Sequence, residues 1–143
     1  MMRFSLFHKI IYIFLIIILF GCQKNEQNGV PIVSVDIYIY TTDPDFVDLN
    51  AVGNWTYVTG GSRGIIVYRY SNNEFKAYDR HCPYQSQNSC ALVTVESSNI
   101  TAKDDCCGST FLLTDGSVTG GPATFPLKQY RTSFDGTVLH IYN

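Results

Sequence analysis

Residues 104–127 read DDCCGSTFLLTDGSVTGGPATFPL, a stretch that combines adjacent cysteines, turn glycines and a proline loop. Within it, Asp115-Gly116 and Gly121-Pro122 are turn signals, because glycine adopts backbone angles that other residues avoid and proline fixes its own φ. The apolar segments between these turns are only a few residues long. Such spacing predicts short β-strands joined by tight loops.

The rest of the chain beyond residue 30 continues this pattern. Residues 32–40 alternate Val and Ile with Ser, Asp and Tyr, a period of two that indicates a half-buried strand. Residues 65–70 are rich in β-branched and aromatic residues, which favour strands, and a turn at 71–74 leads into residues 75–79. The sequence therefore predicts an all-β domain, with a loop or single turn at 46–52. Further strands are expected at 54–58, 92–96, 100–102, 111–113, 117–119, 129–134 and 137–142.

The N-terminal residues 1–21 have the features of a signal peptide. Arg3 and Lys9 precede an apolar run at 10–20, and Gly21-Cys22 follows it. The run is too short to span a bilayer as a helix, which needs about 20 residues. Residues 19–22, LFGC, resemble the lipobox of bacterial lipoproteins, and this resemblance implies a lipid on Cys22. An ordinary secretory signal followed by a spare cysteine is the alternative.

Cleavage before Cys22 would leave a polar tether at 22–30 and one β domain at 31–143. The chain has ten basic and twelve acidic residues, and losing Arg3 and Lys9 with the leader lowers the basic count to eight. A net negative charge without a basic patch argues against a nucleic-acid partner. Lipid chains on Cys22 would attach the protein to a membrane, so we expect it in the cell envelope, periplasmic or surface-exposed.

Four cysteines remain once Cys22 carries lipid: Cys82, Cys90, Cys106 and Cys107. Cysteines of exported proteins usually form disulfides, because the compartments outside the cytoplasm are oxidising. An even number suits a disulfide framework, but four cysteines can pair in three ways. The residues alone leave the pairing open.

Three motifs in the opening stretch resemble the second half of a Rieske [2Fe-2S] domain. That half reads C-x-x-H-G-S-x-F, then D-G-x-V, then G-P-A-x-x-P-L. Here GSTF at 108–111, DGSV at 115–118 and GPATFPL at 121–127 fall in register, and HCPYQ at 81–85 is similar to the first cluster loop. The resemblance implies a fold of small antiparallel sheets with two cysteine-bearing loops at one end.

The same comparison implies that the usual cluster ligands are lost. In the family, two cysteines hold one iron and two histidines the other. Of the four ligand positions, Cys82 keeps its cysteine, whereas Tyr84, Asp104 and Cys107 replace the other three. Tyrosine and aspartate are hard oxygen ligands that match an iron–sulfur cluster poorly. We therefore expect no cluster of the ordinary kind, and no cofactor.

The resemblance also implies a disulfide pairing. Cys106 occupies the place of a family cysteine that bridges the two loops, and Cys90 is the expected partner of Cys106. Cys82 and Cys107 would then pair across the volume that the cluster vacated. Two alternatives remain: the four thiols together could hold zinc or a [2Fe-2S] cluster, or a redox-active pair could form, for example between the adjacent Cys106 and Cys107.

Two further residues of the loops are expected to have ordinary structural roles. Ser109 follows Gly108 as in the family, where such a serine bonds to cluster sulfur. Without a cluster, it should satisfy backbone groups of the loop. His81 lies beside Cys82 and is expected to be a surface or loop-packing residue.

These observations predict a lipid-anchored, Rieske-like domain with a binding or structural role and without enzymatic activity. Its partner is expected to be a protein that the sequence does not name. The alternative is electron transfer, as a ferredoxin-like subunit that holds a [2Fe-2S] cluster through the non-standard set Cys82, Cys90, Cys106 and Cys107.

Overall fold

The structure is a computed structural model that describes residues 26–27 and 29–143. The signal peptide predicted at 1–21, the lipid site Cys22 and residues 23–25 and 28 of the tether lie outside these ranges. Within them, no helix is both long and apolar enough to cross a membrane.

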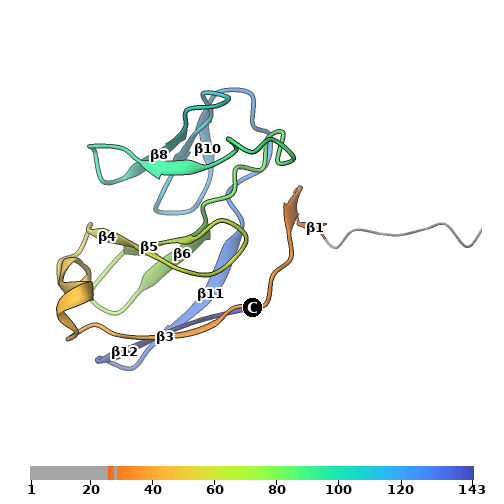
Figure 1. Cartoon of the computed structure of the whole chain (residues 1–143). Helices are drawn as coiled ribbons and strands as arrows, with labels where there is room; N and C mark the ends of the chain where they lie inside the picture. The colour runs from red at the N-terminus through yellow and green to blue at the C-terminus, as the bar shows by residue number, and fades with distance from the viewer. Residues whose placement is uncertain (1–25, 28) are drawn as a thin grey trace, which may run out of the picture.

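Six antiparallel strands form the larger sheet, in the order β3-β12-β11-β6-β5-β4 (Figure 1). Strands β5 and β6 form an antiparallel hairpin, and β12 lies between β11 and β3. The bounds are β3 Asp36–Tyr40, β4 Trp55–Val58, β5 Ile65–Arg69, β6 Phe75–Asp79, β11 Gln129–Phe134 and β12 Val138–Tyr142.

A smaller sheet is inserted between β6 and β11. The chain leaves the larger sheet after Asp79 and returns at Gln129, and the Asp79 amide donates to the Lys128 carbonyl (2.8 Å) where the two connections meet. The inserted strands pair in the order β10-β9-β8-β7, and they form the upper layer in Figure 1. They are β7 Val93–Val95, β8 Thr101–Asp104, β9 Thr110–Leu112 and β10 Val118–Gly120.

Two apolar cores lie on opposite faces of the larger sheet. Side chains alternate across a strand, so Ile66 and Tyr68 of β5 pack in one core whereas Ile65 and Val67 pack in the other. This explains why all four are buried. The first core also contains Val93, Ala102, Phe111 and Leu113 of the smaller sheet and its loops, and Cys82 belongs to it.

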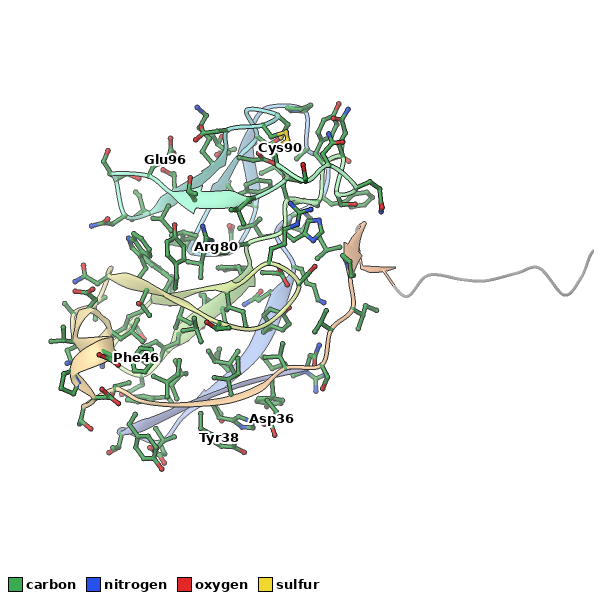
Figure 2. All side chains as sticks on the ribbon, in the orientation of Figure 1. Asp36, Tyr38, Phe46, Arg80, Cys90 and Glu96 are labelled. Atoms are coloured by element: carbon green, nitrogen blue, oxygen red, sulfur yellow. A yellow bond between two sulfur atoms is a disulfide. The ribbon has the colours of Figure 1, made fainter. Side chains whose placement is uncertain are left out.

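Arg80 connects the two sheets at the start of the first cysteine loop, which is the segment after β6 that carries Cys82 (Figure 2). Its side-chain Nε donates to the Val93 carbonyl (3.1 Å), and its guanidinium lies 3.8 Å from the centroid of the Tyr57 ring. Its backbone bonds on both sides, to Gly64 in the larger sheet and to Val93 in the smaller. The loop that follows therefore starts from a fixed point.

The all-β prediction is confirmed, with differences at two segments. The strand expected at 32–40 begins only at Asp36, because the Val35 amide and carbonyl bond instead to Asn143, at 3.0 and 3.3 Å. The segment expected as a loop or single turn is a 3-10 helix, η2 Pro44–Asn50, and Asp43 caps it by accepting from the Asp45 amide (3.0 Å).

The described part of the predicted tether contains a short antiparallel ladder. β1 Glu26–Gln27 pairs with β2 Val30–Pro31. Val30 is fully buried, and the buried Lys128 side chain donates to the Pro31 carbonyl (2.9 Å). The chain thus contacts the folded body from residue 30 onward.

Candidate functional site

The first cysteine loop follows β6 and carries Cys82. The Cys82 amide donates to the Ala91 carbonyl (3.3 Å), which closes the loop on itself. Arg63, in the turn between β4 and β5, holds the far side of the loop. Its guanidinium nitrogens donate to the carbonyls of Ser89 (2.7 Å) and Asn88 (2.8 Å). The loop is thereby fixed at both ends.

A buried carboxylate organises the beginning of this loop. Asp79 is fully buried, and its oxygens accept from three amides and one hydroxyl. The donors are Ser62 N (2.6 Å), Arg63 N (3.3 Å), His81 N (2.8 Å) and Tyr130 Oη (2.6 Å). Burial, followed by the bond to Asp79, raises the pKa of Tyr130 above its ordinary value. These four hydrogen bonds replace the ones that the Asp79 carboxylate would make with water if it were exposed.

His81 is a loop-packing residue, which was one of the two roles expected for it. Its ring nitrogens lie 2.8 Å from the Ser62 hydroxyl and 2.7 Å from the Ser86 carbonyl. The ring is 4% exposed, and both of its nitrogens are used in these contacts. It therefore ties the loop to the β4–β5 turn.

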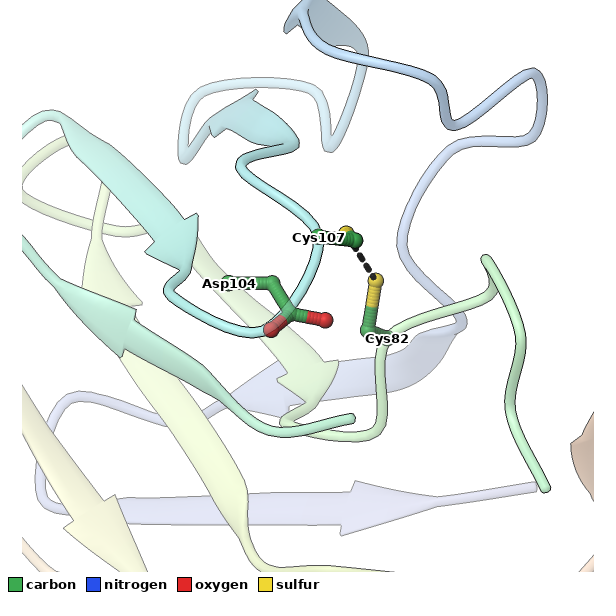
Figure 3. A group of neighbouring side chains, drawn as sticks. All are labelled: Cys82, Asp104 and Cys107. Carbon is green, nitrogen blue, oxygen red and sulfur yellow. Dashed lines mark hydrogen bonds between the residues drawn. The ribbon is translucent and has the colours of Figure 1, made fainter. Parts of the chain in front are cut away.

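The second cysteine loop is a tight turn at the end of β8. The Asp104 amide donates to the Ser109 carbonyl (2.9 Å), and the Gly108 amide donates to the Asp104 carbonyl (2.8 Å). The Cys106 amide donates to Asp104 Oδ1 (2.7 Å). This turn brings the side chains of Asp104 and Cys107 toward Cys82 of the first loop (Figure 3).

The proline loop at 121–127 supports the second cysteine loop through Ser109. The buried Ser109 hydroxyl accepts from the Ala123 amide (3.0 Å) and from the Cys107 thiol (3.1 Å). A Cβ on Gly121 would lie 2.5 Å from Ser109 Cα, so the approach requires glycine, here at φ +83°. The expectation that Ser109 satisfies loop backbone is confirmed.

The structure divides the four cysteines into a bonded and an unbonded pair. A disulfide joins Cys90 to Cys106, as predicted, and it lies at the exposed outer end of the smaller sheet (Figure 2). Cys82 and Cys107 are not bonded: their sulfur atoms lie 3.8 Å apart. The Cys90–Cys106 bond also rules out, in this structure, a Cys106–Cys107 bridge and a site built from all four thiols.

The second predicted disulfide, between Cys82 and Cys107, is therefore absent from the structure. The reason lies in the other partners of these thiols. Cys107 Sγ is held by Ser109, whose hydroxyl and amide lie 3.1 and 3.4 Å from it. Cys82 is buried beside Asp104, and its pKa is raised by burial first and by its side-chain contact as a hydrogen-bond donor to the Asp104 carboxylate second. A raised pKa favours the thiol over the thiolate as long as no metal ion is bound.

Cys82, Asp104 and Cys107 form a compact group of ligand-type side chains. One ligand atom from each lies within 4.8 Å of the others. Cys82 and Asp104 are fully buried and Cys107 is partly exposed. Figure 3 shows the Asp104 carboxylate directed at the same space as the two sulfur atoms. Three positions that sequence comparison assigned to cluster ligands thus meet, whereas Tyr84 packs partly buried against the apolar core.

Asp104 differs from ordinary buried acids because one of its oxygens lacks a partner. Oδ1 accepts from the Cys106 amide, but Oδ2 is buried and has no hydrogen-bond donor among the described residues. Leaving a buried polar atom unsatisfied costs about 1 to 3 kcal/mol, and more for a charged group. One oxygen of the carboxylate is therefore left without a protein donor, and a carboxylate oxygen of Asp104 belongs to the group.

Sequence reasoning did not find Asp79 or Arg63. Both lie in segments predicted only as a strand end and a glycine-rich turn, and neither belongs to a motif. The available signal for Asp79 was its position directly after Ala77 and Tyr78 at the end of a predicted strand, where an acid must be compensated if it is buried. Arg63 gave no such signal.

The fold and the two facing loops define this chain as a Rieske-like domain. The cyanobacterial plasma membrane Rieske protein PetC3 from Synechocystis PCC 6803 is similar over 78% of this chain and all of that one, with 24% identity and a TM-score of 0.54. At this identity the likeness establishes the fold alone. No protein-family model matches the sequence, and no curated protein matches it.

Two further solved structures resemble the chain more distantly. A chain from the complex of oxygenase and ferredoxin in carbazole 1,9a-dioxygenase is 20% identical, with 64% of this chain and 82% of that one covered and a TM-score of 0.45. The E. coli protein NirD is 15% identical, with coverages of 78% and 98% and a TM-score of 0.48.

The residues at the site do not fit an ordinary Rieske cluster. In an ordinary cluster, the ligands at the positions of Cys82 and Cys107 would bind different irons, which lie on opposite sides of the two-iron centre. Their sulfur atoms are 3.8 Å apart, which leaves no space between them for two irons and two sulfides. Asp104 and Tyr84 would add oxygen ligands to a cluster that favours thiolate and imidazole.

Proposed function

We propose that this protein is a Rieske-fold domain of the cell envelope that works without the two-iron cluster and has a binding or structural role. The observation that carries the proposal is the contact between Cys82 and Cys107. With their sulfur atoms 3.8 Å apart, the two loops have closed over the volume that a cluster would fill. The Cys90–Cys106 disulfide joins the two loops in place of the cluster.

The proposal includes a lipid on Cys22 and no catalytic activity. The lipobox-like residues 19–22 support the anchor, which would place the β domain near a membrane surface. The Ser62 and His81 contact lacks an acid on the ring's second nitrogen, which bonds to the Ser86 carbonyl. That arrangement does not activate a nucleophile in the way of a serine–histidine–acid triad.

The test is an analysis of the full chain, expressed with its own leader and extracted in detergent from the envelope fraction without added reductant. We expect no visible absorption and no stoichiometric iron or acid-labile sulfide. Iron and sulfide in a ratio of one to one, with visible absorption, would overturn the proposal. Electron transfer through a non-standard ligand set would then be the function.

The anchor is tested separately by Cys22→Ser. This variant should move from the membrane fraction to the soluble fraction, and the mass of the native protein should exceed that of the cleaved chain by the lipid. Retention of Cys22→Ser in the membrane fraction would contradict the lipid anchor and leave the conclusion about the cluster intact.

A further inference from the structure

We infer that Cys82, Asp104 and Cys107 form a mononuclear zinc site with a fourth position open to water. The inference rests on the proposed function, because a two-iron cluster would use the same side chains. It identifies what the collapsed cluster site binds. The argument uses the spacing of the ligand atoms, the unpartnered carboxylate oxygen and the groups that support the ligands.

The spacing of the two sulfur atoms matches one metal ion rather than two. Zinc–thiolate bonds are about 2.3 Å long, and at a tetrahedral angle two such sulfur atoms lie about 3.8 Å apart. The Cys82 and Cys107 sulfur atoms are 3.8 Å apart. A carboxylate oxygen at about 2.1 Å from the same ion would lie about 3.6 Å from each sulfur, and all three ligand atoms already lie within 4.8 Å of one another.

The unpartnered oxygen of Asp104 supplies the third ligand. Asp104 is fully buried, and its Oδ2 has no donor within the described part of the chain. A cation at the centre of the group would compensate this oxygen, as the four donors compensate Asp79. Figure 3 shows the carboxylate and the two cysteine side chains converging from the two loops.

The supporting contacts suit metal ligands. The Cys106 amide donates to Asp104 Oδ1 (2.7 Å), which fixes the orientation of the carboxylate beside the two sulfur atoms. The Ser109 hydroxyl accepts from the Ala123 amide, so its own proton is available to a Cys107 thiolate 3.1 Å away. The Ser109 amide lies 3.4 Å from the same sulfur. Such partners orient ligands and tune metal sites.

The ligand chemistry selects the ion. Two thiolates and one carboxylate form a mixed sulfur and oxygen set, which suits zinc, whereas magnesium and calcium require oxygen ligands throughout. Binding would release the two thiol protons to solvent as two zinc–sulfur bonds form. The bound group would carry one net negative charge. Cys107 is partly exposed, so water can fill the fourth position from its side.

The experiment uses the full chain with Cys90→Ser and Cys106→Ser, so that Cys82 and Cys107 are the unlipidated thiols left. The protein is treated with a phosphine reductant and a chelator under anaerobic conditions, and circular dichroism confirms that it is folded. It is then titrated with cobalt(II), which reports thiolate ligation through visible absorption, and zinc is added to displace the cobalt. We expect one ion per chain.

Asp104→Asn and Asp105→Asn provide a matched pair of variants. Asp105 is the exposed neighbour of Asp104, and it pairs with Lys103 (3.2 Å) outside the group. We expect Asp104→Asn to weaken zinc binding more than about 100-fold, since losing even a group that only orients a metal ligand costs about 10- to 100-fold. Asp105→Asn should leave binding unchanged. Saturating zinc should also raise the melting temperature by about 5 °C or more.

Two outcomes would overturn the zinc site and leave the cluster-free function standing. One is a folded, metal-free chain that binds no cobalt, and the other is an Asp104→Asn variant that binds cobalt as well as the chain with Asp104. Iron with acid-labile sulfide in the untreated protein would overturn both. A Cys82–Cys107 disulfide that the phosphine fails to open in the folded protein would overturn the zinc site alone.

Discussion

Two buried aspartates, Asp79 and Asp104, end one strand in each of the two sheets and differ in how many hydrogen-bond donors surround them. Both are fully buried, and each follows a strand that leads into a cysteine loop. Asp79 accepts four hydrogen bonds, whereas Asp104 accepts one at Oδ1 and has no donor for Oδ2 among the residues that the structure describes. The comparison separates a carboxylate that holds the fold together from one that is available to a ligand.

The four cysteines also divide into a pair that holds the fold together and a pair without a bond. Cys90 and Cys106 are exposed and bonded, and they fasten the outer ends of the two loops. Cys82 and Cys107 face each other below them without a bond. Under the proposed function, the outer pair is the clamp between the loops, and the inner pair with Asp104 forms the proposed zinc site.

The largest effect should come from Asp79→Asn. The amide has one acceptor oxygen, and its NH₂ group would face backbone donors in a fully buried position, so several donors would lose their partner. We expect the free energy of unfolding to fall by about 3 kcal/mol or more, measured by urea denaturation. A loss below about 1 kcal/mol would mean that Asp79 does not organise the first loop.

Removal of the outer bridge should be nearly as costly. Replacing Cys90 and Cys106 with serine opens a loop closed across 16 residues. On the chain-entropy model, this lowers stability by about 3 kcal/mol. Thermal denaturation of the double variant against the native chain, both without reductant, measures the effect, and equal melting temperatures would contradict a stabilising role for the bridge.

Tyr130→Phe should have an intermediate effect with a distinct pH dependence. It removes one of the four donors to Asp79, and we expect a loss of about 1 to 2 kcal/mol at neutral pH. The pKa of Tyr130 is raised in the folded state, so its contribution is complete below the unfolded value of about 10 and is lost as pH rises above it.

The native chain should therefore lose stability above pH of about 10 more steeply than Tyr130→Phe. Tyr78, whose pKa is also raised by burial, remains in both proteins and contributes a common background. Denaturation at a series of pH values measures the two slopes. Parallel slopes would show that Tyr130 does not carry the alkaline loss.

The smallest effect on stability should come from Asp104→Asn in the metal-free chain. The substitution removes an uncompensated charge and keeps an acceptor for the Cys106 amide, so we expect a change within about 1 kcal/mol of zero, of either sign. Measured beside Asp79→Asn, it tests the contrast between the two acids directly. A loss as large as that of Asp79→Asn would place Asp104 in the fold rather than in the site.

Local sequence patterns were sufficient for most of the fold. The alternation in β3 and the apolar run of β5 predicted strands because side-chain periodicity reports burial directly. The Gly121-Pro122 turn fell where the proline loop approaches Ser109. The start of β3 was misplaced because Val35 bonds to Asn143, a contact between the two ends of the domain that no local pattern reports.

The sequence by itself determined the all-β class, because strand periodicity and turn residues follow from residue types at fixed spacing. The family resemblance added the two cysteine loops, the replaced ligand positions and the Cys90–Cys106 pairing, which the residues alone left open. Only the tertiary structure decided that Cys82 and Cys107 remain unbonded, that Asp79 is satisfied and that Asp104 is not. These outcomes depend on which donors arrive from other strands, and on distances of a few ångströms between loops far apart in the chain. Spacing along a sequence does not fix such distances.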